Sequence, residues 1–215
     1  MPSVFVYVVD RDFGFAPNPF HGYCTLATCK PGIRNSAQIG DWVVGMGGSR
    51  LNATARCIFA MQVTAKITFD EYWSNPIYNE KKPVRNGSRK MMVGDNIYHR
   101  DSGDLRWRQA DSHHSNPDGT VNIHNMERDT RVDQVLISNR FFYFGTAAPV
   151  VPQPILDQLN YKNPRSYRRF ENHVGVPLID WVEANFSKSI NELVGDPFEF
   201  SQSGKRYSGK GSKII

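Results

Sequence analysis

The stretch from Phe13 to Ser49 constrains the fold most, because it holds glycines, prolines, amides and aromatic residues more densely than a packed core needs. In its first half, residues 13–25, aromatic side chains alternate with glycine and proline. Proline lacks the backbone N–H that a strand ladder uses, and glycine favours turns. We expect this half to form a fixed, aromatic-lined loop that serves as one wall of a binding site.

The second half of this stretch predicts regular structure. Pro31 suits the first turn of a short helix over residues 31–38, and Gly40 suits its end. The sequence GDWVVGM that follows indicates a buried strand from Trp42 onward. Loop, helix and strand are therefore expected in succession.

Other segments of the chain predict further strands and helices. Apolar, β-branched runs indicate strands at residues 3–9 and 53–67 and a strand or strand pair at residues 135–144, with a hairpin turn at Gly47-Gly48-Ser49. Thr68 and Glu71 form a capping-box pattern that opens a helix. Further helices are expected over residues 152–159 and 176–186. The polar segment 75–130 is too long for a structureless loop, which favours an ordered insertion over disorder.

Length and composition limit the organisation of the chain. The 215 residues, 40% hydrophobic, bury one core, so we expect a single domain over residues 1–200. Residues 201–215 are basic and rich in Ser and Gly, which predicts a flexible tail. The sequence holds no long apolar run and no secretory pattern, and its three cysteines argue against a disulfide framework. We therefore expect a cytoplasmic protein with no membrane partner.

Candidate ligand-binding residues gather in the central stretch. Aromatic rings stack on bases, amides and carboxylates read their edges, and Lys or Arg holds phosphate. On these grounds the predicted ligand-binding residues are Phe13, Phe15, Asn18, Phe20, His21, Tyr23, Lys30, Arg34, Asn35, Asp41 and Trp42. The net charge of +5 agrees with an anionic partner, although much of the excess lies in the tail.

Candidate catalytic residues form the cluster DSHHS, in which Asp111 precedes His113 and His114. Imidazoles exchange protons near neutral pH, so one of them is a candidate general base. Contact with ligand and a solvated loop pair are the alternatives. The pattern of Ser and Cys residues does not identify a catalytic triad.

Metal and cofactor motifs are weak. Cys24 and Cys29 with the two histidines offer zinc ligand types, but no second close pair stands at finger-like spacing, so no metal site is predicted. The glycines at 45, 47 and 48 match neither a P-loop nor a dinucleotide fingerprint. The sequence identifies no cofactor and no oligomeric state.

Several of these segments together resemble a known family. The order of GDWVVGMGGS, CIFAMQVTAKI and TFDEYWSNPIYN is similar to the EVE branch of the PUA-like fold. More closely, DFGFAPNPFHGYCTLATCKPGIR with GDWVVGMGGS, DSHHS and VLISNRFFYFG resembles the second type of nucleotide modification associated domain, over residues 4–145. The resemblance implies an α+β protein with a PUA-like mixed β-barrel, short helices and a C-terminal helical annex.

The same resemblance implies a role beside DNA base hypermodification in phage and bacteria. We expect a nucleotide or modified nucleobase, either free or within DNA, held in an aromatic-lined cleft inside a bacterial host cell. Three alternatives stay open: a reader of a modified base in DNA, a sponge or receptor for a free nucleotide immune signal in anti-phage defence, and a nucleotide-modifying enzyme using His113 and His114.

Overall fold

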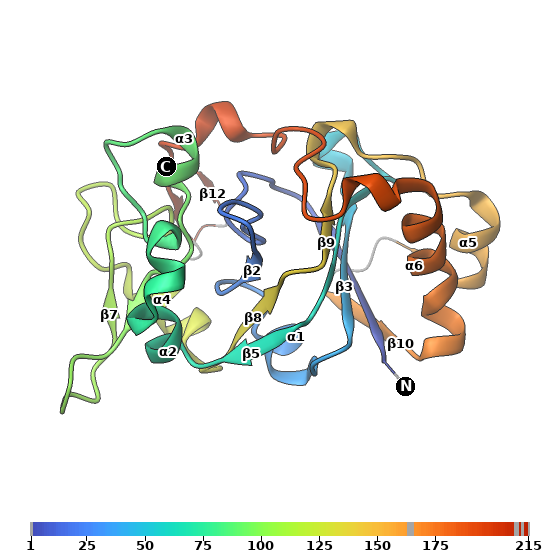
Figure 1. The fold of residues 1–215 in the computed structure, drawn as a ribbon. Helices are drawn as coiled ribbons and strands as arrows, with labels where there is room; N and C mark the ends of the chain where they lie inside the picture. The colour runs from blue at the N-terminus through green and yellow to red at the C-terminus, as the bar shows by residue number, and fades with distance from the viewer. Residues whose placement is uncertain (1, 163–165, 209–210, 212, 215) are drawn as a thin grey trace.

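The computed structural model describes residues 2–162, 166–208, 211 and 213–214, and their arrangement is drawn in Figure 1. The described strands form one five-stranded sheet, one three-stranded sheet and two short two-stranded sheets. In Figure 1 helices α5 and α6 lie at one end of the molecule and α2, α3 and α4 at the other, with the larger sheets between them. The α+β class predicted from the sequence is confirmed.

The five-stranded sheet forms the centre of the protein. Its order is β10-β1-β3-β4-β9, in which β1 and β3 run parallel and the other pairs are antiparallel. Strands β1 and β3 are β-branched and aromatic and are almost completely buried, as expected of strands covered on both faces. The bounds of the five strands, in sheet order, are Tyr167–Phe170, Val4–Val9, Trp42–Gly47, Cys57–Gln62 and Phe141–Tyr143.

The predicted strand over residues 53–67 is divided between two sheets. Its first part is β4, whereas β5 (Ala65–Ile67) pairs with β8 (Val135–Ser138) in the three-stranded sheet, whose order is β2-β8-β5. Strand β2 (Cys24–Leu26) completes that sheet. The segment 135–144 is likewise divided into β8 and β9.

The barrel part of the expectation is not borne out. The described strands do not close on themselves, because β10 and β9 remain the two edges of the central sheet and β5 passes to the second sheet. A PUA-like barrel would need these edges to pair.

The three-stranded sheet lies between two hydrophobic cores. Successive residues of β8 point to opposite faces, so Leu136 belongs to the first core while Val135 and Ile137 belong to the second. The first core surrounds the central sheet. The second core joins the aromatic loop to the insertion and includes Phe13, Phe15 and Tyr98.

The insertion over residues 75–130 is ordered, as predicted. It contains the 3-10 segment η2 (Pro76–Lys81), helices α3 (Arg89–Met92) and α4 (Ile123–Asp129), and the hairpin of β6 (Tyr98–His99) with β7 (Arg108–Gln109). The capping box before it is also confirmed in α2 (Phe69–Ser74), where Thr68 N–H donates to Glu71 Oε2 over 2.7 Å and Glu71 N–H to Thr68 Oγ1 over 3.2 Å.

The predicted helices are present with shifted ends. Helix α1 covers Pro31–Ser36 and α5 covers Gln153–Gln158. Helix α6 (Asn172–Phe186) begins earlier than expected and carries Pro177 inside it. Because Pro177 has no N–H for the carbonyl of His173, that carbonyl needs another donor, and Gln158 Nε2 supplies it over 3.3 Å.

The last described residues contact the body of the protein. After the 3-10 segments η4 (Ser187–Ser189) and η5 (Phe200–Gln202), strands β11 (Tyr207–Ser208) and β12 (Lys213–Ile214) form a small antiparallel pair. Tyr207 N–H donates to the carbonyl of His113 over 2.7 Å. The single domain and the flexibility of the tail stay predictions. Among the described residues no helix combines the length and apolar character that a membrane span requires.

Candidate cysteine-histidine-aspartate site

A cleft of about 790 Å³ opens where the end of β1, the aromatic loop, the start of α1 and the insertion meet. Aromatic, charged and thiol side chains line it together. Those that matter below are Tyr7, Asp10, Arg11, Phe13, Phe15, Cys29, Lys30, Arg50, His113, His114, Arg128 and Tyr207.

Cys29 occupies an unusual backbone position at this cleft. Its φ is 57° and that of Lys30 is 39°, so two successive non-glycine residues lie in the left-handed region. Such positions cost roughly 1–3 kcal/mol each and require support from their surroundings. The Cys29 N–H donates to Asp129 Oδ1 over 3.0 Å, and Arg34 Nε donates to the Cys29 carbonyl over 2.9 Å.

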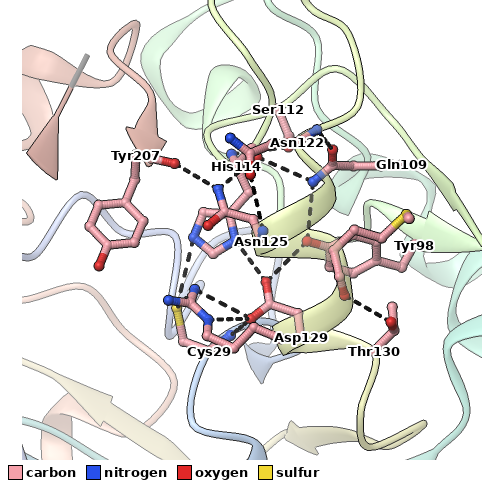
Figure 2. A network of polar contacts seen from close by, with 12 residues as sticks. Cys29, Tyr98, Gln109, Ser112, His114, Asn122, Asn125, Asp129, Thr130 and Tyr207 are labelled. Atoms are coloured by element: carbon pink, nitrogen blue, oxygen red, sulfur yellow. Dashed lines mark hydrogen bonds and ion pairs between the residues drawn. The ribbon is translucent and has the colours of Figure 1, made fainter. Parts of the chain in front are cut away.

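Three side chains from distant parts of the sequence meet here, as Figure 2 shows. The Cys29 Sγ lies 3.8 Å from His114 Nε2. The other ring nitrogen, Nδ1, lies 2.7 Å from Asp129 Oδ2. A nucleophile, a base and an acid that orients the base are thus arranged in the order of a catalytic triad.

Further hydrogen bonds fix the backbone of His114 and the carboxylate of Asp129 (Figure 2). Asn125 Nδ2 donates to the His114 carbonyl over 2.8 Å, and Gln109 Nε2 donates to the same carbonyl over 3.2 Å. Tyr98 Oη donates to Asp129 Oδ2 over 3.0 Å. His114 and Asp129 are both buried, so these partners hold the pair in one orientation.

The electrostatics of the site favour a thiolate. Burial alone raises the pKa of Cys29, but the charge and hydrogen bond of His114, aided by Arg128, bring it below its ordinary value. Burial lowers the pKa of His114, yet Asp129 and Cys29 raise it to about 9. Asp129, despite burial, has its pKa lowered to about 2 by His114, Arg128 and Arg34. These directions favour a thiolate beside an imidazolium.

His113 has a different character from its neighbour. Burial, together with the charge of His114, lowers its pKa to about 3, so the ring is neutral. Its Nδ1–H donates to the carbonyl of Lys205 over 2.7 Å. The ring lies 4.6 Å from that of Phe13 and 5.1 Å from that of Phe15, which makes His113 part of the aromatic wall.

Comparison with known families gives one match that covers most of the chain. The model of nucleotide modification associated domain 2 matches residues 1–204. The chain belongs to this family. No curated protein and no solved structure matches the chain. Membership in nucleotide modification associated domain 2 links the protein to nucleotide modification and leaves the chemistry to be read from the site.

In this family member, five of the residues predicted from the sequence line the cleft. They are Phe13, Phe15, Lys30, His113 and His114. The fold brings the aromatic loop and the histidine pair together across a long stretch of chain.

The remaining predicted residues have other partners. Arg34 is fully buried and donates to the carbonyls of Cys29, Asp129, Val132 and Gln134. Asp41 accepts N–H bonds from Ser3 and Gln38. Asp111 pairs with Arg206 at the surface. These three stabilise the fold and do not line the cleft.

Six further predicted residues also lie outside the cleft lining. Asn18 binds the buried ammonium of Lys81 over 2.8 Å, and the rings of Phe20, Tyr23 and Trp42 pack on other aromatic rings. The last two are His21, which lies 3.3 Å from Glu80, and Asn35, which is exposed.

Three residues that complete the candidate site were not predicted from the sequence. Cys29 was interpreted as a weak zinc-ligand candidate or a buried small residue, and Arg128 and Asp129 were not among the predicted site residues. The positive φ of Cys29, which marks it in the structure, has no sequence signal because cysteine rarely adopts it. Arg128-Asp129 lies at the end of α4 in a run of charges typical of a solvated face.

A metal ion fits this donor set poorly. One ligand atom of each of Cys29, His114 and Asp129 lies within 4.8 Å of the others. However, Asp129 already accepts from Cys29 N–H, Tyr98 and His114, and the guanidinium of Arg128 lies 3.8 Å from the sulfur. A cation would compete with these donors and with the positive charge of Arg128. Cys24 is buried elsewhere, with its sulfur 3.8 Å from that of Met61.

Proposed function

We propose that the protein is a nucleotide-modifying enzyme that uses Cys29 as a covalent nucleophile. The observation that carries this proposal is the sequence of contacts from Cys29 Sγ to His114 and from His114 to Asp129, at the wall of a cleft of about 790 Å³. Family membership supports a nucleotide, or a base derived from one, as the substrate.

The thiolate and imidazolium suit acyl transfer. In the first step Cys29 Sγ forms a bond with the acyl carbon of an amide or ester, and the bond to the leaving nitrogen or oxygen breaks. The proton on His114 Nε2 passes to the leaving group. Water, or the amine of an acceptor, then attacks the thioester and gives a proton to Nε2. The carbon–sulfur bond breaks and the thiolate is restored.

Asp129 orients His114 and stabilises its charge throughout this cycle. Its bond to Nδ1 leaves Nε2 directed at the sulfur, and its charge stabilises the imidazolium. Phe13, Phe15 and the neutral ring of His113 offer apolar surface on which a base stacks, an interaction that contributes roughly 1–3 kcal/mol per base.

The proposal is tested by trapping the intermediate. The purified protein is incubated with a pool of nucleotides and N-acylated nucleosides, quenched in acid and analysed by intact-mass and peptide mass spectrometry. We expect an acyl adduct on the peptide that contains Cys29, and its loss together with turnover in Cys29→Ala. Cys57→Ala is the matched control, because Cys57 is buried in the first core.

Two results would count against the enzyme. Turnover that persists in Cys29→Ala would exclude the cysteine as nucleophile. Ligand that binds but is recovered intact, with no adduct on Cys29, would favour a binding protein, whether a reader of DNA or a receptor for a free nucleotide.

A further inference from the structure

We infer that the cleft contains a phosphate subsite in which Lys30 and Arg128, with Arg50, bind a phosphoryl group of the substrate beside Cys29. This inference rests on the proposed function, since it names the group by which the substrate is held. It replaces the sequence-based pair of Lys30 and Arg34, because Arg34 is directed into the fold.

Lys30 is the first element of the subsite. Its Nζ lies 4.4 Å from the centre of the Tyr7 ring, and no described residue makes a hydrogen bond or ion pair with it. Burial lowers the pKa of Lys30 even though Cys29 and Asp10 act to raise it. A half-buried ammonium without a hydrogen-bonding partner is costly, and an anion in the cleft relieves that cost.

Arg128 is the second element. Its Nη2 lies 3.8 Å from Cys29 Sγ and 3.5 Å from Asp129 Oδ1. Its Nε also lies 3.5 Å from Asp129 Oδ1, but it makes no hydrogen bond among the described residues. The guanidinium also lies over the ring of Tyr207, 5.7 Å from its centre. All these contacts are long, so the planar fork of donors retains capacity for a phosphate, which it fits in a bidentate manner.

The net charge of the cleft lining also favours an anionic ligand. Among the described lining residues there are four cationic side chains, Arg11, Lys30, Arg50 and Arg128, and one acidic side chain, Asp10. Asp129 pairs with Arg128 from behind the lining, and the Cys29–His114 pair is neutral as a unit, so the cations remain in excess. A cleft lined mainly by one sign of charge concentrates ions of the other sign. The substrate class is therefore a phosphorylated nucleotide, either free or as part of a DNA strand.

The rate at which Cys29 is alkylated by small reagents tests the phosphate subsite even though the substrate is not known. Iodoacetate and iodoacetamide alkylate a thiolate by the same displacement, but only iodoacetate carries a negative charge. We expect the ratio of iodoacetate to iodoacetamide rates at Cys29 to exceed that of free cysteine at the same pH. Lys30→Met should lower this ratio about fivefold, the effect of one charge at about 4 Å in a solvent-like medium.

The matched control is Lys188→Met, which removes an exposed lysine of η4 outside the cleft lining. It should leave the ratio unchanged, and thermal melts should show that both variants fold. A wild-type ratio equal to that of free cysteine, or an unchanged ratio in Lys30→Met, would overturn the subsite. Slow labelling by both reagents would instead count against the nucleophile, so the two failures are distinguishable.

Protection of Cys29 from iodoacetamide then separates the sources of phosphate. The probes are inorganic phosphate, a deoxynucleoside monophosphate, the matching nucleoside and a short single-stranded DNA. Protection by the monophosphate well beyond the nucleoside supports a free nucleotide, and protection by the DNA alone supports a backbone phosphate. Equal protection by nucleoside and monophosphate, or protection by none of the phosphates, would contradict the inference.

Discussion

The protonation of Cys29 depends on two opposing effects at the scale of single residues. Burial favours the neutral thiol, while the charge and hydrogen bond of His114 favour the thiolate, and the second effect prevails. Cys57 has no imidazolium beside it, and burial, opposed only by a hydrogen bond to the backbone of Phe59, raises its pKa to about 12. The neighbouring imidazolium therefore decides which of the buried sulfurs is reactive.

The first prediction follows from this balance. Because the pKa of Cys29 is lowered, its alkylation by iodoacetamide should persist to lower pH than that of free cysteine. In His114→Asn, burial and the charge of Asp129 raise the pKa and Arg128 alone opposes them, so the midpoint of the pH profile should move upward, past that of free cysteine. Peptide mass spectrometry over a pH series measures both profiles, with Cys57 as an unreactive internal standard. A midpoint in the variant equal to that of the wild type would refute the ion pair.

Arg34 shows how a charged side chain becomes structural. It is fully buried, and its guanidinium donates to the carbonyls of residues 29, 129, 132 and 134. It thereby ties the Cys29 turn to the end of α4 and to the segment before β8. The positive charge is also partly balanced by Asp129.

The second prediction separates Arg34 from Lys30. Arg34→Met leaves several buried carbonyls without donors, each costing about 1–3 kcal/mol, so the free energy of unfolding should fall by roughly 3 kcal/mol or more. Lys30→Met, which removes no side-chain hydrogen bond to a described residue, should change the free energy of unfolding far less. Urea denaturation measures both. An Arg34→Met protein that is as stable as the wild type but binds nucleotide poorly would contradict this structural role. It would support the sequence-based prediction that Arg34 contacts the ligand.

At the scale of secondary-structure elements, the close contact of α6 with β1 depends on Gly175. A β-carbon at this position would lie 2.6 Å from the β-carbon of Val4 and 2.7 Å from its Cγ2. Glycine weakens a helix by about 1 kcal/mol relative to alanine. The sequence retains it because the helix must approach the sheet at that point.

The third prediction compares the gain in helix propensity with the cost of overpacking at position 175. Gly175→Ala gains about 1 kcal/mol of helix propensity, but overpacking against Val4 costs typically 1–3 kcal/mol, so the variant should be net destabilised. Asp180→Ala on the exposed face of α6 is the matched control and should change stability little. Thermal unfolding compares them. A Gly175→Ala protein more stable than the wild type would mean that the helix moves away from β1 at little cost.

At the scale of the whole molecule, two cores share one sheet. Leu26 and Leu136 pack in the first core, while Ala27, Val135 and Ile137 of the same segments pack in the second. Neither core is complete without the three-stranded sheet. The cleft lies at this junction, since Tyr7 comes from the first core and Phe13 and Phe15 from the second.

The fourth prediction is that the two cores unfold together. Two-state unfolding is not assured for a chain of 215 residues, but a shared sheet couples the cores. In urea, fluorescence and far-UV circular dichroism should give coincident transitions in Trp42→Phe and in Trp107→Phe, which remove a reporter from the first and second core respectively. Separate midpoints for the two probes would show independent units and contradict the single domain.

Features that depend on neighbours along the chain could be predicted from the amino-acid sequence. The buried runs of β1 and β3, the capping box of Thr68 and Glu71 and the family were all readable, because periodicity, capping and motifs act over a few residues. The tertiary structure alone decided the site. Cys29, His114 and Asp129 are separated by 85 and 15 residues and meet only after the insertion packs on the aromatic loop. Likewise, only long-range packing turned Arg34 inward and left Lys30 in the cleft, since the local sequence favours neither direction for a cation on so short a helix.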